Sequence, residues 1–156
     1  MTFNLDALKI DAALESEKVA QFVVEHTRDK LRRRGVVVGL SGGIDSAVMA
    51  SLAVKAMGKE NVFGLIMPEK ESNPVSSSYA EAHAQELGIE TKKVDLTTAV
   101  DAVGSYRDRD AFIASLIPAY TPECKYNIRL PTDLLERSAL NFYTLNVELP
   151  DGSLEK

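Results

Sequence analysis

The sequence predicts an α/β fold in which helices flank an open parallel sheet. Short apolar runs at 36–40 and 62–67, and a third short strand predicted at 91–96, alternate with helical patterns at 46–57 and up to residue 87. This strand–helix–strand order is typical of parallel sheets covered by helices. A glycine-rich turn also joins the first apolar run to the helix that follows it. Such a turn is typical of sheets that bind ligands beyond the carboxyl ends of their strands.

The first third of the chain predicts a helix, a strand and a second helix. Apolar residues recur at roughly helical spacing over 5–33, and Gly35 ends that stretch. Residues 36–40 are continuously apolar, so we expect a strand whose two faces are both covered. Residues 46–57 are rich in alanine and predict a helix that stops at Gly58.

The next segment predicts a second strand–helix–strand unit. Residues 62–67 are all apolar, and a polar loop over 69–77 contains Asn73-Pro74 as a breaker. Three serines at 76–78 offer N-caps for a helix that runs to Leu87. Residues 91–96 predict a third short strand.

The pattern weakens after residue 97. Helices are predicted over 97–103, 110–117 and 132–140, and a half-buried strand over 143–149 from its alternating apolar residues. A turn at 150–152 would open a hairpin, but only four residues follow it and we expect no returning strand. The chain is therefore predicted to be truncated.

Composition narrows the class of protein. The 156 residues are 45% hydrophobic and 26% charged, with a net charge of −5, as in a globular protein without broad nucleic-acid affinity. No apolar run approaches the length that spans a membrane, and the N-terminus lacks a signal-peptide pattern. A single cysteine, Cys124, cannot form an internal disulfide, which indicates a reducing, cytoplasmic setting. We expect neither a nucleic-acid nor a membrane partner.

The turn at 41–46 reads Ser-Gly-Gly-Ile-Asp-Ser and has the chemistry of a phosphate site. Glycines let a ligand approach the backbone, and the free N–H groups at a helix N-terminus attract phosphate. Ser41 and Ser46 add hydroxyl donors. Asp45 would repel a bare phosphate, but it could face one across a Mg²⁺ ion. The alternative is a glycine-rich turn in which Asp45 only caps or charges the helix.

These six residues resemble the S-G-G-x-D-S pyrophosphate loop of the N-type ATP pyrophosphatases. The loop isoleucine, the GLIMP stretch at 64–68 and the loop and helix at 71–90 look most like ammonia-dependent NAD synthetases. The resemblance implies an adenine nucleotide alpha hydrolase-like, Rossmann-like fold. It also implies that 1–156 form a single ATP-pyrophosphatase-like domain whose C-terminal part is missing.

The resemblance implies a C–N bond-forming ligase that uses ATP, Mg²⁺ and ammonia to convert nicotinic acid adenine dinucleotide to NAD. The nicotinate carboxylate would attack the α-phosphate, pyrophosphate would leave, and ammonia would displace AMP. The position of Lys70 after the second strand adds it as a candidate near the triphosphate. The nucleotide-binding residues are then predicted to be Gly39, Leu40, Ser41, Gly42, Gly43, Ile44, Asp45, Ser46, Ile66, Met67 and Lys70, with Asp45 as the metal ligand.

The chain also departs from the family. A T-N-x-x-E-type stretch that adds a metal carboxylate is not found, and neither is a glutaminase domain. Two alternatives therefore stay open: another ATP pyrophosphatase with a different acceptor, or a non-catalytic nucleotide-binding fragment. The family also implies a homodimer. His83 has no partner at metal-ligand spacing and is predicted to be a surface or packing residue.

Overall fold

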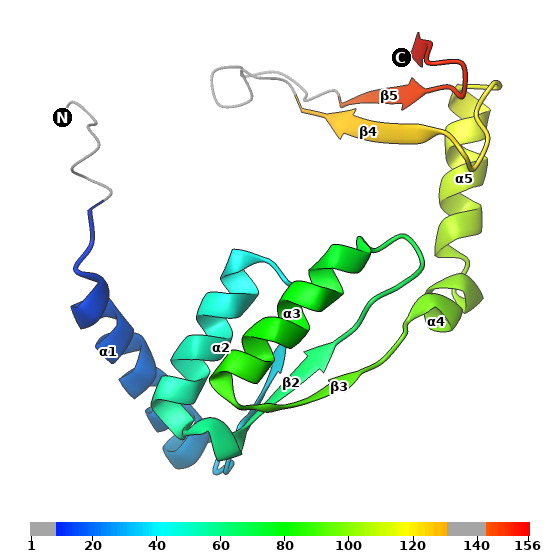
Figure 1. The fold of residues 1–156 in the computed structure, drawn as a ribbon. Helices are drawn as coiled ribbons and strands as arrows, with labels where there is room; N and C mark the ends of the chain where they lie inside the picture. The colour runs from blue at the N-terminus through cyan, green and yellow to red at the C-terminus, as the bar shows by residue number, and fades with distance from the viewer. Residues whose placement is uncertain (1–8, 131–142) are drawn as a thin grey trace. The chain divides into compact units, whose positions relative to one another are not determined.

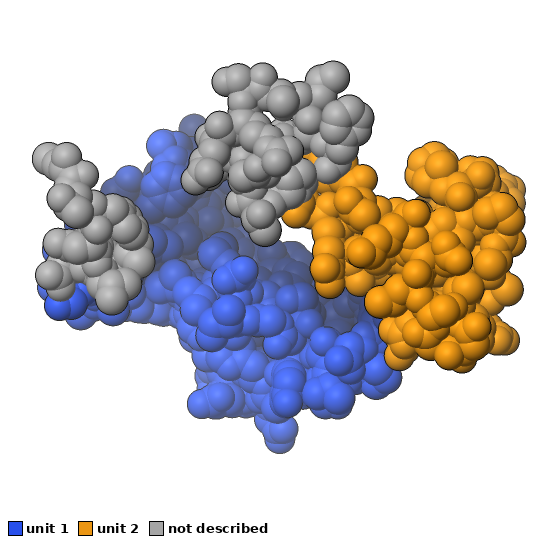
Figure 2. All heavy atoms as spheres, turned by 90° about the horizontal axis from the view of Figure 1, so that it is seen from above, with its two compact units in different colours: residues 1–97 blue, residues 98–156 orange. Residues whose placement is uncertain are grey.

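The computed structural model describes residues 9–130 and 143–156. The chain divides into two compact units, residues 1–97 and residues 98–156 (Figure 2), each with a hydrophobic core of its own. The predicted helix at 132–140 lies outside the described residues. The assignment of 1–156 to a single domain stays a prediction. No helix in the described part of the chain is long and apolar enough to cross a membrane.

The first unit, unit 1, contains a three-stranded parallel sheet. Its strands are β1 (Val36–Gly39), β2 (Val62–Ile66) and β3 (Glu90–Lys93), in the order β1-β2-β3. Val38 lies opposite Gly64, and Gly64 lies opposite Thr91. The predicted parallel sheet is therefore confirmed, and all three strands end at the same edge.

The helices of unit 1 follow the predicted order. α1 (Ala12–Val24) continues into a π-helical stretch (Glu25–Lys30), and α2 (Ile44–Met57) is followed by a short 3₁₀ turn (Lys59–Asn61). α3 (Pro74–Leu87) lies beside α2, and both cover the same face of the sheet (Figure 1). α1 packs against α2.

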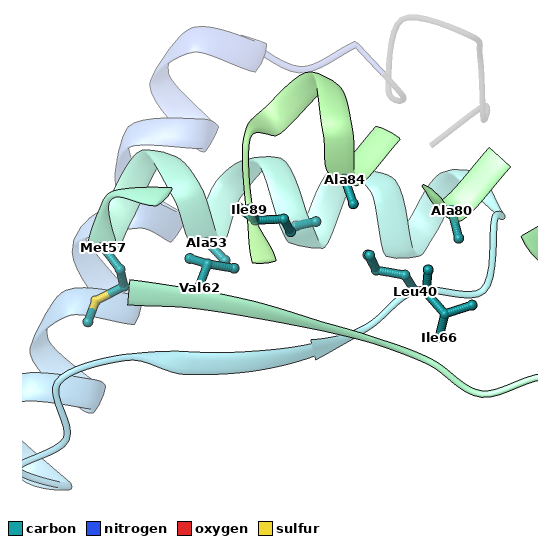
Figure 3. Close-up of a cluster of buried hydrophobic side chains, with 9 residues drawn as sticks. Leu40, Ala53, Met57, Val62, Ile66, Ala80, Ala84 and Ile89 are labelled. Atoms are coloured by element: carbon teal, nitrogen blue, oxygen red, sulfur yellow. The ribbon is translucent and has the colours of Figure 1, made fainter. Parts of the chain in front are cut away.

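Small residues allow α2 and α3 to approach each other and the sheet closely. Ala50, Ala53, Ala80 and Ala84 are all buried at the contact between the two helices and the strands. Larger side chains fill the remaining space (Figure 3). The other buried members of this core are Leu40, Met57, Val62, Ile66 and Ile89.

The opposite face of the sheet is much less covered. Val37 on β1 is 65% exposed and Met67, just after β2, is 47% exposed. The prediction that 36–40 is covered on both faces is therefore wrong for the described residues. An all-apolar run does not show which element covers each face, because the covering groups come from elsewhere in the fold.

The start of α3 also differs from the prediction. The Asn73 side chain accepts a hydrogen bond from the backbone N–H of Val75 at 3.0 Å, and Pro74 is the first helical residue. The serines at 76–78 lie inside the first turns instead of capping them. Asn73-Pro74 does not break the helix but begins it, because proline is favoured at the first helical position, where its missing N–H costs nothing.

The second unit, unit 2, joins helices to an antiparallel sheet. α4 (Thr97–Ala102) begins at the boundary and α5 (Ser105–Leu116) follows, longer than the predicted 110–117. The sheet order is β4-β5-β6, formed by β4 (Lys125–Arg129), β5 (Thr144–Glu148) and β6 (Leu154–Glu155). β4 was not predicted. The expectation of no returning strand is wrong, because β6 pairs with β5.

Aromatic rings and a half-buried ion pair organise the core of unit 2. Tyr120 donates a hydrogen bond to Asp110 Oδ1 at 2.8 Å, and an Arg109 nitrogen lies 2.8 Å from the same oxygen. The guanidinium of Arg109 also lies 5.4 Å from the ring centre of Tyr126. Burial, followed by the Asp110 contact, raises the pKa of Tyr120 to about 12. The fully buried Val147 of β5 belongs to the same core.

Candidate nucleotide-binding site

The glycine-rich turn leads from the end of β1 into the first turn of α2. Leu40 is buried and continues the β ladder through its N–H, which donates to the carbonyl of Leu65 at 2.7 Å. Gly43 is the N-cap of α2 and, being glycine, has no side chain that could cap the helix. The first N–H groups of the helix therefore have no partner from within the helix, which is the arrangement that binds phosphate.

Gly42 brings this turn against the beginning of α3. Its φ of 79° lies in the left-handed region that favours glycine. A Cβ atom at this position would overlap the backbone carbonyl oxygen of Ser76 and lie 2.8 Å from its carbonyl carbon. Gly42 is therefore required both by its backbone angle and by close contact with α3.

Two serine hydroxyls close the turn on itself. The Ser41 N–H donates to Ser46 Oγ at 3.2 Å, and the Ser46 hydroxyl donates to the Gly43 carbonyl at 2.9 Å. The Gly43 N–H is 3.3 Å from Ser41 Oγ, and the two hydroxyl oxygens lie 3.1 Å apart. The turn is thus held in shape by its own hydrogen bonds before any ligand binds.

A cavity of about 210 Å³ opens beside the turn, where β1 and β2 end. Apolar side chains from the strand ends form one part of its wall, and polar groups from the loop and first turn of α3 form the other. This combination suits a ligand with a flat apolar part and a polar tail. Its lining residues are Leu40, Ser41, Ile66, Met67, Pro68, Ser72, Asn73, Ser76 and Ser77.

Two larger hollows lie elsewhere. One of about 500 Å³ lies at the opposite edge of the sheet, where Val36 and Val62 begin their strands. The other, of about 610 Å³, lies in unit 2 beside Phe112 and Ile128 and is mostly apolar. Size alone does not locate the site, because ligands of parallel sheets bind at the carboxyl ends of the strands.

The structure brings most of the predicted site residues together. Leu40, Ser41, Ile66 and Met67 line the cavity at the strand ends. Behind the turn, a small space of about 30 Å³ is lined by several of the other predicted residues. These are Gly42, Gly43 and Ser46, which lie with Ala47, Leu40 and three residues of α3, Tyr79, Ala80 and His83.

Three predicted residues lie at the margin. Gly39 is exposed, and a Cβ built on it would lie 3.8 Å from Met67 Cε. Ile44 is 76% exposed. Lys70 lies in the loop between β2 and α3 but does not line the cavity.

Sequence reasoning missed the contribution of the α3 side of the cavity. Ser72, Asn73, Ser76 and Ser77 line it together with Pro68. The available signal was the cluster of serines directly after an apolar strand end. That cluster was interpreted as a set of helix caps, although strand ends are where parallel sheets place their ligand groups.

The exposed side chain of Asp45 is accessible to a ligand or a metal ion. It is exposed in the first turn of α2 and makes no hydrogen bond or ion pair with any residue the structure describes. It is not the helix cap, which is Gly43. Among residues 9–130 and 143–156, no group of three or more His, Cys, Asp or Glu side chains could hold a metal ion.

Comparison with known proteins gives the family. The family model described as NAD synthase matches residues 15–117, which is most of unit 1 and the beginning of unit 2. The chain belongs to the NAD synthase family. The predicted resemblance is therefore confirmed.

Individual NAD synthase relatives extend the match. The NH(3)-dependent NAD(+) synthetase of Rhizobium rhizogenes strain K84 is 43% identical over 150 residues, which are 95% of this chain and 44% of that protein. The chain thus spans less than half the length of this relative.

Solved structures agree on the fold. An NH3-dependent NAD synthetase from Campylobacter jejuni, in complex with nitrate, is 33% identical with a TM-score of 0.56, over 71% of this chain and 52% of that one. An NMN synthetase from Francisella tularensis is 31% identical with a TM-score of 0.54, over 72% of this chain and 42% of that one. The predicted Rossmann-like fold is confirmed by these neighbours.

Proposed function

We propose that this chain provides the ATP-binding part of an NAD synthetase, an ATP-dependent ligase that amidates nicotinic acid adenine dinucleotide to NAD. The observation that carries the proposal is the preformed turn at 41–46, which opens onto a cavity at the ends of β1 and β2. Membership of the NAD synthase family supports the same reaction.

The two sides of the site suit the two ends of ATP. Leu40, Ile66 and Met67 offer apolar surface and backbone groups to the adenine ring. The N–H groups of the first turn of α2 and the Ser41 and Ser46 hydroxyls would hold the phosphates. The positive end of the α2 dipole adds to this attraction.

The proposed reaction has two steps, formation of an acyl adenylate with release of pyrophosphate and displacement of AMP by ammonia. A carboxylate oxygen of the acceptor attacks the α-phosphorus, the bond to the bridging oxygen breaks, and pyrophosphate departs. Ammonia then attacks the acyl carbon of the adenylate, AMP leaves with the bonding electron pair, and the nitrogen loses a proton. Donors at the turn that stay fixed while pyrophosphate departs stabilise the charge that develops on it.

Magnesium fits the one carboxylate at the turn. Asp45 has no internal partner in the described structure, and carboxylate and phosphate oxygens are the ligands that Mg²⁺ prefers. Bound Mg²⁺ would neutralise charge on the phosphate oxygens. Because Asp45 is a single carboxylate, water and ATP itself would supply the other ligands.

A calorimetric titration tests the nucleotide site. Wild-type chain should bind ATP in the presence of Mg²⁺, and Asp45→Ala should weaken this binding about ten-fold or more by removing the charged metal ligand. Glu60→Ala, which removes a carboxylate at the far edge of the sheet, is the matched control and should leave the affinity unchanged. Equal affinity of wild type and Asp45→Ala would remove Asp45 from the metal role.

A second experiment tests the reaction. A longer natural protein that contains this sequence, given ATP, Mg²⁺, ammonia and nicotinic acid adenine dinucleotide, should form NAD and AMP. Formation of ADP, or no dinucleotide product, would show that the assignment is wrong.

A second candidate acceptor is supported by the similarity to the Francisella NMN synthetase. In that case the acceptor would be nicotinic acid mononucleotide and the product NMN. Release of pyrophosphate with each acceptor in turn separates the two. Faster release with the mononucleotide would favour this second function.

We also propose that the working enzyme is a homodimer in the cytoplasm. The single cysteine, Cys124, is buried and unpaired, which suits a reducing compartment. Sedimentation velocity on the longer protein should show twice the mass of one chain, and a monomer at micromolar concentration would count against the dimer.

A further inference from the structure

One histidine joins the helix of the phosphate turn to the neighbouring helix. His83 of α3 places its Nε2 atom 3.1 Å from the carbonyl oxygen of Ala47 and 3.2 Å from Ser51 Oγ, both on α2. The side chain is half-buried, at 26% exposure. Ala47 is the residue directly after Ser46, so the contact lies in the first turns of α2.

The partners decide which ring nitrogen carries a proton. A carbonyl oxygen can only accept, so Nε2 must be the donor to Ala47. The Ser51 hydroxyl already donates to the same carbonyl at 2.9 Å, and its oxygen can therefore also accept from Nε2. The Nδ1 atom faces Glu86 at 3.8 Å, a side chain that is 81% exposed.

The rest of the contact between α2 and α3 contains no directional hydrogen bond in the part of the chain that the structure describes. It is apolar and includes the buried alanines Ala50, Ala53, Ala80 and Ala84, which permit close approach of the two helices. His83 provides the only side-chain hydrogen bonds between α2 and α3 among the described residues. It also lines the small space behind the turn, together with Gly43 and Ser46.

We propose that His83 is a positioning residue that fixes the first turns of α2 and thereby the orientation of the phosphate-binding N–H groups. This role rests on the proposed function, because it assigns His83 to the ATP site. The ring does not line the larger cavity where the nucleotide would lie, so it acts through α2. Loss of the donor should loosen the turn while the alanine core keeps the helices folded.

The experiment compares three substitutions at this position by calorimetry with ATP and Mg²⁺. His83→Leu keeps the bulk and removes the donor, so binding should weaken about five-fold, as for a lost buried hydrogen bond. His83→Asn keeps polarity but is too short to reach Ala47, and should weaken binding equally. His83→Gln, whose amide N–H can reach the carbonyl, should restore affinity to within about two-fold.

Hydrogen exchange in the free protein gives an independent measurement. The Ala47 amide, which donates to Gly43 at 3.2 Å, should exchange faster in His83→Leu than in wild type, and His83→Gln should reverse this. Gln85→Leu, an exposed change on the same helix, is the control and should alter neither measurement.

Each outcome separates the two proposals. Failure of the wild type to bind ATP would count against the nucleotide site, while the exchange measurement would still test His83. Wild-type affinity and wild-type exchange in His83→Leu would overturn the positioning role. So would a His83→Gln variant that is as impaired as His83→Leu, because packing and not the hydrogen bond would then be the cause.

Discussion

Unit 1 and unit 2 each pack helices on a three-stranded sheet, but they bury different chemistry. Unit 1 joins α2, α3 and the parallel strands through four alanines and leaves its polar groups at the strand ends. Unit 2 buries Tyr120 and Cys124 and holds a charged pair, Arg109 and Asp110, among its aromatic rings. The first arrangement builds an edge that can receive a ligand, while the second satisfies its polar groups internally.

This difference predicts which kind of substitution each unit tolerates least. In unit 1 neighbouring groups lie so close to some glycines that an added methyl group is the sensitive change, as at Gly42, which faces the Ser76 backbone, and at Gly64, which faces the side chains of Leu40 and Thr91. In unit 2 the large side chains fill the space, so a removed group is the sensitive change. Four substitutions test this contrast, given in order of decreasing expected effect, and two further variants serve as their controls.

Gly42→Ala should have the largest effect. The alanine would be held at positive φ and its Cβ would overlap the Ser76 carbonyl, so we expect a loss of about 4 kcal/mol in the unfolding free energy of unit 1. ATP binding should be lost as well. Urea unfolding and calorimetry measure the two effects.

Gly43→Ala is the matched control for Gly42→Ala. The nearest atom to its added Cβ is Ser41 Oγ at 3.4 Å, and its φ of −87° suits any residue. The unfolding free energy should fall by less than about 1 kcal/mol. Equal losses for the two alanines would show that close contact with α3 is not what requires glycine.

Ile113→Ala should be the most damaging of these changes in unit 2. Ile113 is 3% exposed in the core of this unit, and truncation should cost about 3 kcal/mol through lost burial and the cavity left behind. Hydrogen exchange should show faster opening of β4 and β5, with β1 and β2 unchanged. The neighbouring Phe112, 64% exposed, is the control, and its alanine variant should cost under about 1 kcal/mol. Equal acceleration in β1 and β2 would show that the two cores unfold together.

Gly64→Ala should have an intermediate effect. Its Cβ would lie 2.8 Å from Leu40 Cδ1 and 2.9 Å from Thr91 Cγ2, and both are side-chain ends that can shift. We expect a loss of about 1–2 kcal/mol in thermal or urea unfolding, smaller than at Gly42 because no backbone atom is struck. A loss equal to that of Gly42→Ala would mean that the sheet cannot move its side chains.

Apart from the two controls, Tyr120→Phe should have the smallest effect at neutral pH, a loss of about 1 kcal/mol from the hydrogen bond to Asp110. The pKa of Tyr120 is raised from 10.0 to about 12, so the folded state favours the protonated phenol. Its contribution is complete below pH 10 and is lost as the pH rises toward 12. The unfolding free energy, measured with urea between pH 10 and pH 12, should fall less steeply with pH in the variant than in wild type. An identical dependence of the unfolding free energy on pH would show that Tyr120 does not contribute to the loss of stability at alkaline pH.

Elements that depend on local sequence patterns could be predicted, whereas elements that depend on contacts between distant segments could not. Most strands and helices of unit 1 were predicted because they carry their own apolar pattern and their own stop signal within a few residues. β3 is the exception, because its residues Glu90–Lys93 are polar and exposed. β4 was missed although Tyr126 and Ile128 alternate with polar residues, because the run is only five residues long, is exposed throughout, and takes its register from β5, for example Asn127 opposite Asn146. β6 was missed because two residues give no period to detect.

The site divides in a similar way. Glycine and serine spacing in 41–46 indicated the turn and the proposed phosphate site, because those residue types act through the local backbone. The α3 side of the cavity, with Ser76 and Ser77, depends on which helix lies beside the turn, and no local pattern reports this. The same holds for His83, whose role comes from the carbonyl 36 positions earlier in the chain.

Local sequence is enough to predict the parallel sheet, the glycine-rich turn at the end of β1 and the family, because each depends on residues close together in the chain. Three features emerge only from the folded chain: the requirement for glycine at position 42, the residues of the second cavity wall, and the contacts of His83 with α2. These features depend on α3 lying against α2. That placement is set by the packing of buried alanines from both helices, and no single segment encodes it.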